Sequence, residues 1–142
     1  TQCVLILFSV FLLFWLGSCA ADGKNSVDSE EVLSPTLEDI SQYEEPEKLA
    51  TLIEDGTPEH ILIDVRTPGE YSEGHIPTAV NIPLSEIEAQ IPDLPRSQLT
   101  IVYCRSGGRS SRAAEALNAA GFEYVVDFGG INRWTGEVVK GE

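Results

Sequence analysis

The sequence predicts an α/β domain with an open, mostly parallel sheet and helices on both faces. Short apolar runs at residues 61–65, 99–103 and 124–127 have the length and composition of buried strands. Between them, residues 84–91 and 112–120 carry apolar side chains at helical spacing. Strands that alternate with helices are typical of a parallel sheet covered on both sides.

The elements follow one another without an internal repeat. In chain order we expect helix 47–54, strand 61–65, helix 84–91, strand 99–103, helix 112–120 and strand 124–127. Apolar residues three and four positions apart give each helix one buried face. Gly56 and Gly121 follow the first and last of these helices and are expected to end them. We therefore expect one folded domain at residues 35–142.

Cys104 stands where a predicted strand ends and a Gly- and Arg-rich loop begins. Backbone N–H groups of such a loop and of the next helix can converge on one point and stabilise negative charge. A thiol held there has a lowered pKa, and its thiolate is a nucleophile. An isolated cysteine is more often structural, but this context favours function. The residues expected to bind an anion beside the thiol are Arg105, Ser106, Gly107, Gly108, Arg109 and Ser110.

The distribution of charge indicates the same site. The chain carries a formal net charge of −14, yet residues 94–114 contain four arginines and no carboxylate. A cationic stretch in an acidic protein favours a small anion as ligand. The acidic composition disfavours nucleic acid as a partner. No cofactor or metal is expected, because His60, His75 and Cys104 are too scattered in the chain for metal-ligand spacing.

Three segments in order resemble the rhodanese family of thiosulfate sulfurtransferases. They are the Cys104–Ser110 loop, residues 62–83 with the runs LIDVRTPGEY and GHIP, and residues 126–134 with the run VDFGGI. The resemblance implies a single-domain, rhodanese-like sheet of about five strands. It also implies that the Cys104 thiolate takes the outer sulfur of thiosulfate or a similar donor and passes it on from a persulfide.

The resemblance also implies roles for the neighbouring residues. The loop amides would hold the terminal sulfur of the persulfide, and Arg105 and Arg109 would bind the small sulfur-containing anion. Four signature residues are expected to support the loop, namely Asp64, Arg66, Glu70 and His75. The alternative for His75 is a role as a catalytic base.

Two other functions remain open. Phosphatases and arsenate reductases of related fold use a Cys-x5-Arg loop, whereas Cys104 and Arg109 are spaced Cys-x4-Arg, which favours a single sulfur atom. A persulfide carrier or envelope sulfur sensor would have the same loop but would not turn over a small donor. No second thiol is expected in the folded domain, so the acceptor would be an external thiol, a protein or a cyanide-type nucleophile.

The N-terminal residues predict a membrane-anchored protein of the cell envelope. Residues 4–16 are apolar except for Ser9 and lead into Leu16-Gly17-Ser18-Cys19, which resembles a bacterial lipobox. We expect a signal peptide at residues 1–18, lipid on Cys19 and a flexible acidic tether over residues 19–34. The folded domain would then face the periplasm or the exterior. A plain secretory signal or an uncleaved anchor is the alternative.

Overall fold

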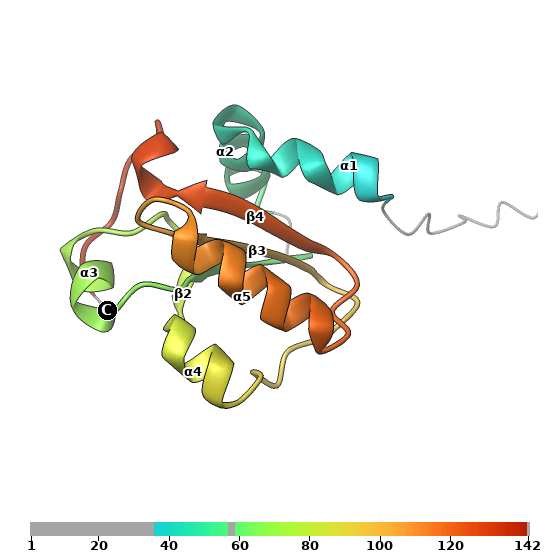
Figure 1. Cartoon of the computed structure of the whole chain (residues 1–142). Coiled ribbons are helices and arrows are strands. Elements are labelled where there is room, and N and C mark those ends of the chain that lie inside the picture. Colours follow the sequence, from blue (N-terminus) through green and yellow to red (C-terminus); the bar gives the residue numbers. More distant parts are fainter. Residues whose placement is uncertain (1–35, 57–58, 142) are drawn as a thin grey trace, which may run out of the picture. The chain divides into compact units, whose positions relative to one another are not determined.

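The protein folds around an open sheet of four parallel strands with helices on both sides (Figure 1). The computed structural model describes residues 36–56 and 59–141. The strands are β1 (His60–Asp64), β2 (Val80–Asn81), β3 (Leu99–Cys104) and β4 (Val125–Gly130), in the spatial order β2-β1-β3-β4. The expected signal peptide, the lipidation site at Cys19 and the tether at residues 19–34 lie outside the described residues.

Five α-helices and two short 3-10 helices complete the described part of the chain. The α-helices are α1 (Leu37–Ser41), α2 (Pro46–Glu54), α3 (Pro68–Glu73), α4 (Leu84–Ala89) and α5 (Gly108–Ala119), and the 3-10 helices are η1 (Gln42–Glu44) and η2 (Ile131–Arg133). The predicted α/β class is confirmed. The described sheet has four strands rather than about five.

The sheet separates two apolar layers, so the expectation of helices on both faces is confirmed. Helices α4 and α5 cover one face, and α1 and α2 lie on the other (Figure 1). Buried residues between the sheet and α4 and α5 include Ile63, Val65, Val102, Leu84, Ile87, Ala113 and Leu117. Those on the opposite face include Ile40, Leu49, Leu62, Ile101, Tyr103, Val126 and Phe128.

Successive side chains of a strand point to opposite faces, and this alternation decides where the thiol lies. On β3, Tyr103 belongs to the layer under α1 and α2, whereas Cys104 belongs to the layer under α4 and α5. Cys104 is also the last residue of its strand. Because the chain continues from β1 to one edge of the sheet and from β3 to the other, a crevice is expected beyond the carboxyl ends of these two strands.

Helix α3 begins at a capping box just after β1. The Thr67 hydroxyl accepts the backbone N–H of Glu70, and the Glu70 carboxylate accepts the backbone N–H of Thr67. Pro68 occupies the first helical position, where its missing N–H costs nothing. The two devices together stabilise a helix of only six residues and fix the position of the Glu70 carboxylate.

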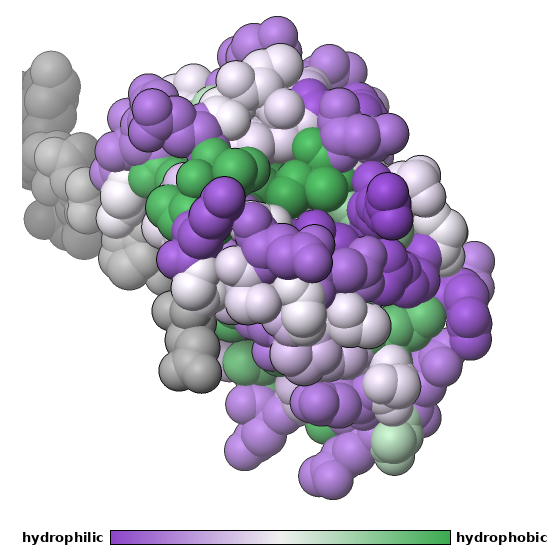
Figure 2. Space-filling model, turned by 90° about the vertical axis from the view of Figure 1, so that its left-hand side faces the viewer, coloured by the Kyte–Doolittle hydropathy of each residue, from purple (hydrophilic) through white to green (hydrophobic). Residues whose placement is uncertain are grey.

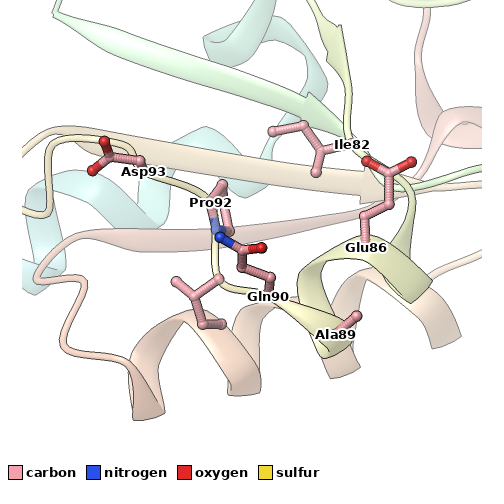
Figure 3. A pocket seen from close by; sticks show the side chains of 7 residues that line it. Ile82, Glu86, Ala89, Gln90, Pro92 and Asp93 are labelled. Atoms are coloured by element: carbon pink, nitrogen blue, oxygen red, sulfur yellow. The ribbon is translucent and has the colours of Figure 1, made fainter.

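One feature of the surface lies apart from the end of β3. A hollow of about 480 Å³ opens beside α4, and none of its lining residues belongs to the Cys104–Ser110 segment (Figure 3). It is lined by Ile82, Glu86, Ala89, Gln90, Ile91, Pro92 and Asp93.

Among residues 36–56 and 59–141, none of the helices combines the length and the apolar character that spanning a membrane requires.

Candidate active site

The segment after β3 folds tightly around the Cys104 sulfur. The backbone N–H of Gly107 donates to Sγ of Cys104 at 3.0 Å, and Cys104 is 1 % exposed. Gly107 has φ of 109°, which a side chain rarely adopts, and α5 begins at the next residue. The helix was expected to start only at residue 112. Arg109 and Ser110 therefore lie in its first turn, while residues 105–107 form the loop.

Hydrogen bonds around the sulfur favour the thiolate. Burial by itself raises the pKa of the Cys104 thiol, but backbone N–H groups of Ser110, Gly107 and Ser106 and the Ser110 hydroxyl outweigh it. The net pKa lies below its ordinary value. This agrees with the lowered thiol pKa that the sequence predicts for a strand-to-helix junction.

Ser110 ties this first helical turn to the rest of the site. It is fully buried, and its hydroxyl lies within donating distance of the carbonyl oxygens of Gly107 at 2.9 Å and Gly129 at 3.1 Å. Gly129 belongs to β4, so the hydroxyl joins the start of α5 to the end of the neighbouring strand. Ser110 thus helps to fix the backbone donors that face the sulfur.

The Ser110→Ala variant should react more slowly at its thiol. Losing the hydroxyl weakens stabilisation of the thiolate, so the pKa of Cys104 rises, and the rate of alkylation at pH 7 should fall roughly threefold or more. The measurement is the rate of reaction with iodoacetamide between pH 5 and pH 10. Ser111→Ala, on an exposed residue of the same helical turn, is the control. An unchanged pH profile in Ser110→Ala would contradict this role of the hydroxyl.

Arg109, in the first turn of α5, and Glu70, in α3, form an ion pair with two hydrogen bonds. Nη1 donates to Oε2 at 2.7 Å and Nη2 to Oε1 at 2.8 Å. The hydrogen bond from Arg109 lowers the pKa of Glu70 to about 2 and outweighs the opposing effect of burial, so the carboxylate is ionised at neutral pH. Thus α3 and α5, which are far apart in sequence, are joined beside the thiol.

Arg105 differs from Arg109 in its ion pairing. It is exposed, and no carboxylate among the described residues pairs with it. The sequence assigned both arginines to anion binding. In the structure, the guanidinium of Arg109 is already bound by a carboxylate, whereas that of Arg105 is available to a ligand.

Two glycines at the end of β4, Gly129 and Gly130, let the backbone of the loop pack closely against this strand. A Cβ at Gly130 would lie 2.8 Å from the carbonyl oxygen of Arg105 and 2.9 Å from the Cα of Ser106, and it would also overlap the Asn132 side chain. A Cβ at Gly129 would be strained, because its φ is 89°. Neither these glycines nor Asn132 was expected at the site. The Gly-Gly pair at a strand end was a signal of close backbone approach.

A buried ion pair lies at the end of β1. Asp64 is 0 % and Arg66 6 % exposed, and Nη2 of Arg66 donates to Oδ2 of Asp64 at 2.6 Å. Arg66 also donates to the carbonyl oxygen of Gly74 at 2.7 Å. Burial raises the pKa of Tyr103, and the negative charge of Asp64 raises it further. The arrangement ties the end of β1 to the end of β3 and to the segment after α3.

His75 is held away from this arrangement by its own contacts. Its ring stacks on Tyr71 with centroids 3.7 Å apart, and Nδ1 lies 3.0 Å from the carbonyl oxygen of Tyr71. Its backbone forms an isolated antiparallel bridge with Val139. Among the described residues, no hydrogen bond joins His75 to Cys104 or to residues 105–107. The geometry gives the catalytic-base alternative no support.

The candidate site lies at the carboxyl edge of the sheet, the side seen in Figure 2. Polar residues cover much of this side, with apolar residues gathered in smaller areas. The structure brings Glu70 to Arg109, and Asp64 to Arg66, around the ends of β1 and β3. Over the described ranges, no group of three or more His, Cys, Asp or Glu residues is arranged to hold a metal ion.

Comparison with known families and proteins agrees with this geometry. The family described as "Rhodanese-like domain" matches residues 45–137. A sulfurtransferase from Allochromatium vinosum is 37% identical over 79 residues, which cover 55% of this chain and 74% of the relative. The thiosulfate sulfurtransferase PspE of Escherichia coli is 38% identical over 81 residues, covering 56% of this chain and 78% of PspE. These relatives support sulfur transfer in general.

Solved structures show the same fold. A rhodanese from E. coli, determined with anions, superposes with a TM-score of 0.54 at 34% identity, covering 58% of this chain and 99% of that chain. The Alr3790 protein from Anabaena superposes with a TM-score of 0.62 at 29% identity, covering 68% of this chain and 79% of that chain.

Proposed function

This chain belongs to the family of rhodanese-like domains, and on that premise we propose that it moves sulfane sulfur from thiosulfate or a similar donor to an external acceptor through a persulfide on Cys104. The observation that carries the proposal is the backbone N–H of Gly107 directed at the Cys104 sulfur, in a loop that lowers the pKa of this thiol.

The chemistry needs two displacements at sulfur. In the first, the Cys104 thiolate attacks the outer sulfur of thiosulfate, a new S–S bond forms, and sulfite leaves with the electron pair of the bond that breaks. In the second, a thiolate or cyanide attacks the terminal sulfur of the persulfide, and Cys104 leaves as a thiolate. The loop amides stabilise negative charge on sulfur in both steps.

The structure of the loop also favours sulfur over a phosphoryl group. The Cys-x4-Arg spacing is one residue shorter than that of related phosphatases, and the guanidinium of Arg109 is bound by Glu70. Cys104 is the free cysteine of the described residues. An acceptor from outside the domain is therefore part of the proposal.

The test is the mass of the intact protein before and after exposure to thiosulfate, with Cys104→Ser as the control. We expect a gain of one sulfur atom that cyanide or a thiol removes and that the variant lacks. Repeated release of thiocyanate from thiosulfate and cyanide would then establish turnover. A protein that gains sulfur from no small donor would overturn the proposal in favour of a partner-loaded carrier, and hydrolysis of an aryl phosphate that Cys104→Ser abolishes would do so in favour of a phosphatase.

A further inference from the structure

Glu70 is linked through Arg109 to the helix that begins directly after the thiol loop, although no hydrogen bond joins it to the sulfur. Its two oxygens bind both terminal nitrogens of Arg109, five residues after Cys104. The pair is not deeply buried, with 34% of the Arg109 side chain and 25% of the Glu70 side chain exposed. Hydrogen bonding to Glu70 raises the pKa of Arg109, and the negative charge of Cys104 contributes in the same direction. Arg109 lies in the first turn of α5, directly after the loop, so its guanidinium binds Glu70 at the end of the helix that faces the thiol segment.

The carboxylate is fixed independently of Arg109. It also accepts hydrogen bonds from the backbone N–H and the hydroxyl of Thr67, both at 3.1 Å, as part of the capping box of α3. Glu70 therefore has little conformational freedom to lose when it pairs with Arg109. An incoming anion must compete with a carboxylate that is already oriented and ionised.

Two other arginines near the ends of the strands, Arg66 and Arg133, have partners of their own. Asp64 and Arg66 neutralise each other at the end of β1. Arg133 directs its guanidinium to the carbonyl oxygens of Phe128 and Glu44. Arg105, which follows Cys104 in the chain, is exposed and has no carboxylate partner among the described residues. Of the two arginines at positions 105 and 109, one is thus paired with a carboxylate and the other is not.

We propose that Glu70 determines which sulfur donors this site accepts. By neutralising Arg109, Glu70 leaves Arg105 as the one unpaired arginine next to Cys104 in the chain. A single positive charge suits a singly charged donor, such as an organic thiosulfonate or a persulfide, better than dianionic thiosulfate. This inference rests on the proposed function. It assigns Glu70 a role in specificity beyond supporting the loop, because the same carboxylate that caps α3 also lowers the positive potential at the sulfur.

The variant that isolates this effect is Glu70→Gln. Glutamine keeps one oxygen that can accept from Thr67 and from Nη1 of Arg109, while its amide nitrogen replaces the oxygen that accepts from Nη2. It is a normal residue at this position of a capping box, so the fold is retained while the negative charge is lost. Glu73→Gln is the matched control, because Glu73 is an exposed residue of the same helix for which no ion pair with an arginine is found.

The first measurement does not depend on sulfur transfer. The rate of Cys104 alkylation by anionic iodoacetate, divided by the rate with neutral iodoacetamide, reports the potential at the sulfur. Glu70→Gln should raise this ratio about threefold at low ionic strength, and Glu73→Gln should leave it near the wild-type value. An unchanged ratio in Glu70→Gln, or an equal rise in both variants, would overturn the inference.

The second measurement uses donors of different charge. In Glu70→Gln, the KM for thiosulfate should fall about tenfold and the KM for benzenethiosulfonate about threefold, since a dianion gains twice the electrostatic free energy of a monoanion. Equal shifts for both donors would contradict a role of charge. If the wild-type protein transfers sulfur but the variants do not differ, the inference fails and the proposed function stands. If no donor loads the wild type, the proposed function fails, and the alkylation ratio still decides whether Glu70 sets the potential.

Discussion

Substituting Gly130 by alanine should reduce sulfur transfer by about 100-fold, because a displacement of the reacting groups by about 1 Å has effects of this size. The backbone at Gly130, with φ of −111° and ψ of 137°, is one that alanine adopts freely. The added methyl group, however, would lie within 3 Å of Arg105 and Ser106, at 2.8 Å and 2.9 Å. The loop must therefore move away from β4, and the N–H groups around Cys104 move with it.

This effect should be separable from unfolding. Overpacking of this kind costs about 1–3 kcal/mol, which is less than the total stability of a typical domain. The measurement is kcat/KM with thiosulfate, accompanied by the rate of Cys104 alkylation and by thermal unfolding. Gly69→Ala on α3 is the control, since no atom lies within 4 Å of its added methyl group. Wild-type activity in Gly130→Ala would show that the loop does not depend on this close approach.

Asp64→Asn should destabilise the fold by about 3–5 kcal/mol, because it leaves the buried cation of Arg66 without a counter-charge. Asp64 is fully buried and accepts the backbone N–H, Nε and Nη2 of Arg66. Asparagine has the same shape but offers one oxygen and no charge. For a domain of this size, a loss of this magnitude lowers Tm by roughly 15–30 °C.

Urea unfolding monitored by tryptophan fluorescence measures this loss directly. Asp93→Asn, on an exposed residue, is the matched control and should change the free energy of unfolding by less than about 0.5 kcal/mol. The double variant Asp64→Leu/Arg66→Met should recover much of the loss, because apolar residues of similar volume remove the unpaired charge altogether. A cost below about 1 kcal/mol for Asp64→Asn would mean that water reaches and solvates Arg66.

The elements that the sequence predicted well are those whose apolar pattern is strong. The runs at residues 61–65 and 99–103 correspond to β1 and β3, each within one residue at either end. Helix α5 begins four residues before its predicted start, because Gly107 turns the chain so sharply that the helix starts directly after it. Helix α3 was missed because none of its six residues is buried, so it lacks the apolar spacing by which the equally short α4 was predicted, although its Thr-Pro-x-Glu capping signal was present.

At the site, the sequence predicted features that depend on neighbouring residues but not contacts between residues far apart in the chain. The position of Cys104 between a strand and a helix predicted a lowered thiol pKa. This prediction was possible because the groups that lower the pKa lie within six residues of Cys104 in the chain. The pairing of Arg109 with Glu70 joins residues 39 positions apart, and nothing in the spacing of charges along the chain indicates it. The support from Gly130 depends on the pairing of β4 with β3, where the register shifts between Val102 and Tyr103. Such contacts are set by the topology of the sheet.

The capping box of α3 has a consequence for how this domain can vary. One carboxylate, that of Glu70, both starts a helix and balances a cation beside the reactive sulfur. Aspartate would retain the charge but would not reach Arg109 with the same geometry, and alanine would lose both contributions. Glutamine keeps the helix start, removes the negative charge and gives up one of the two hydrogen bonds from Arg109, because its amide nitrogen is a donor. Evolution or a protein engineer could therefore retune the site at this position, without rebuilding the scaffold, by a single amide-for-acid exchange.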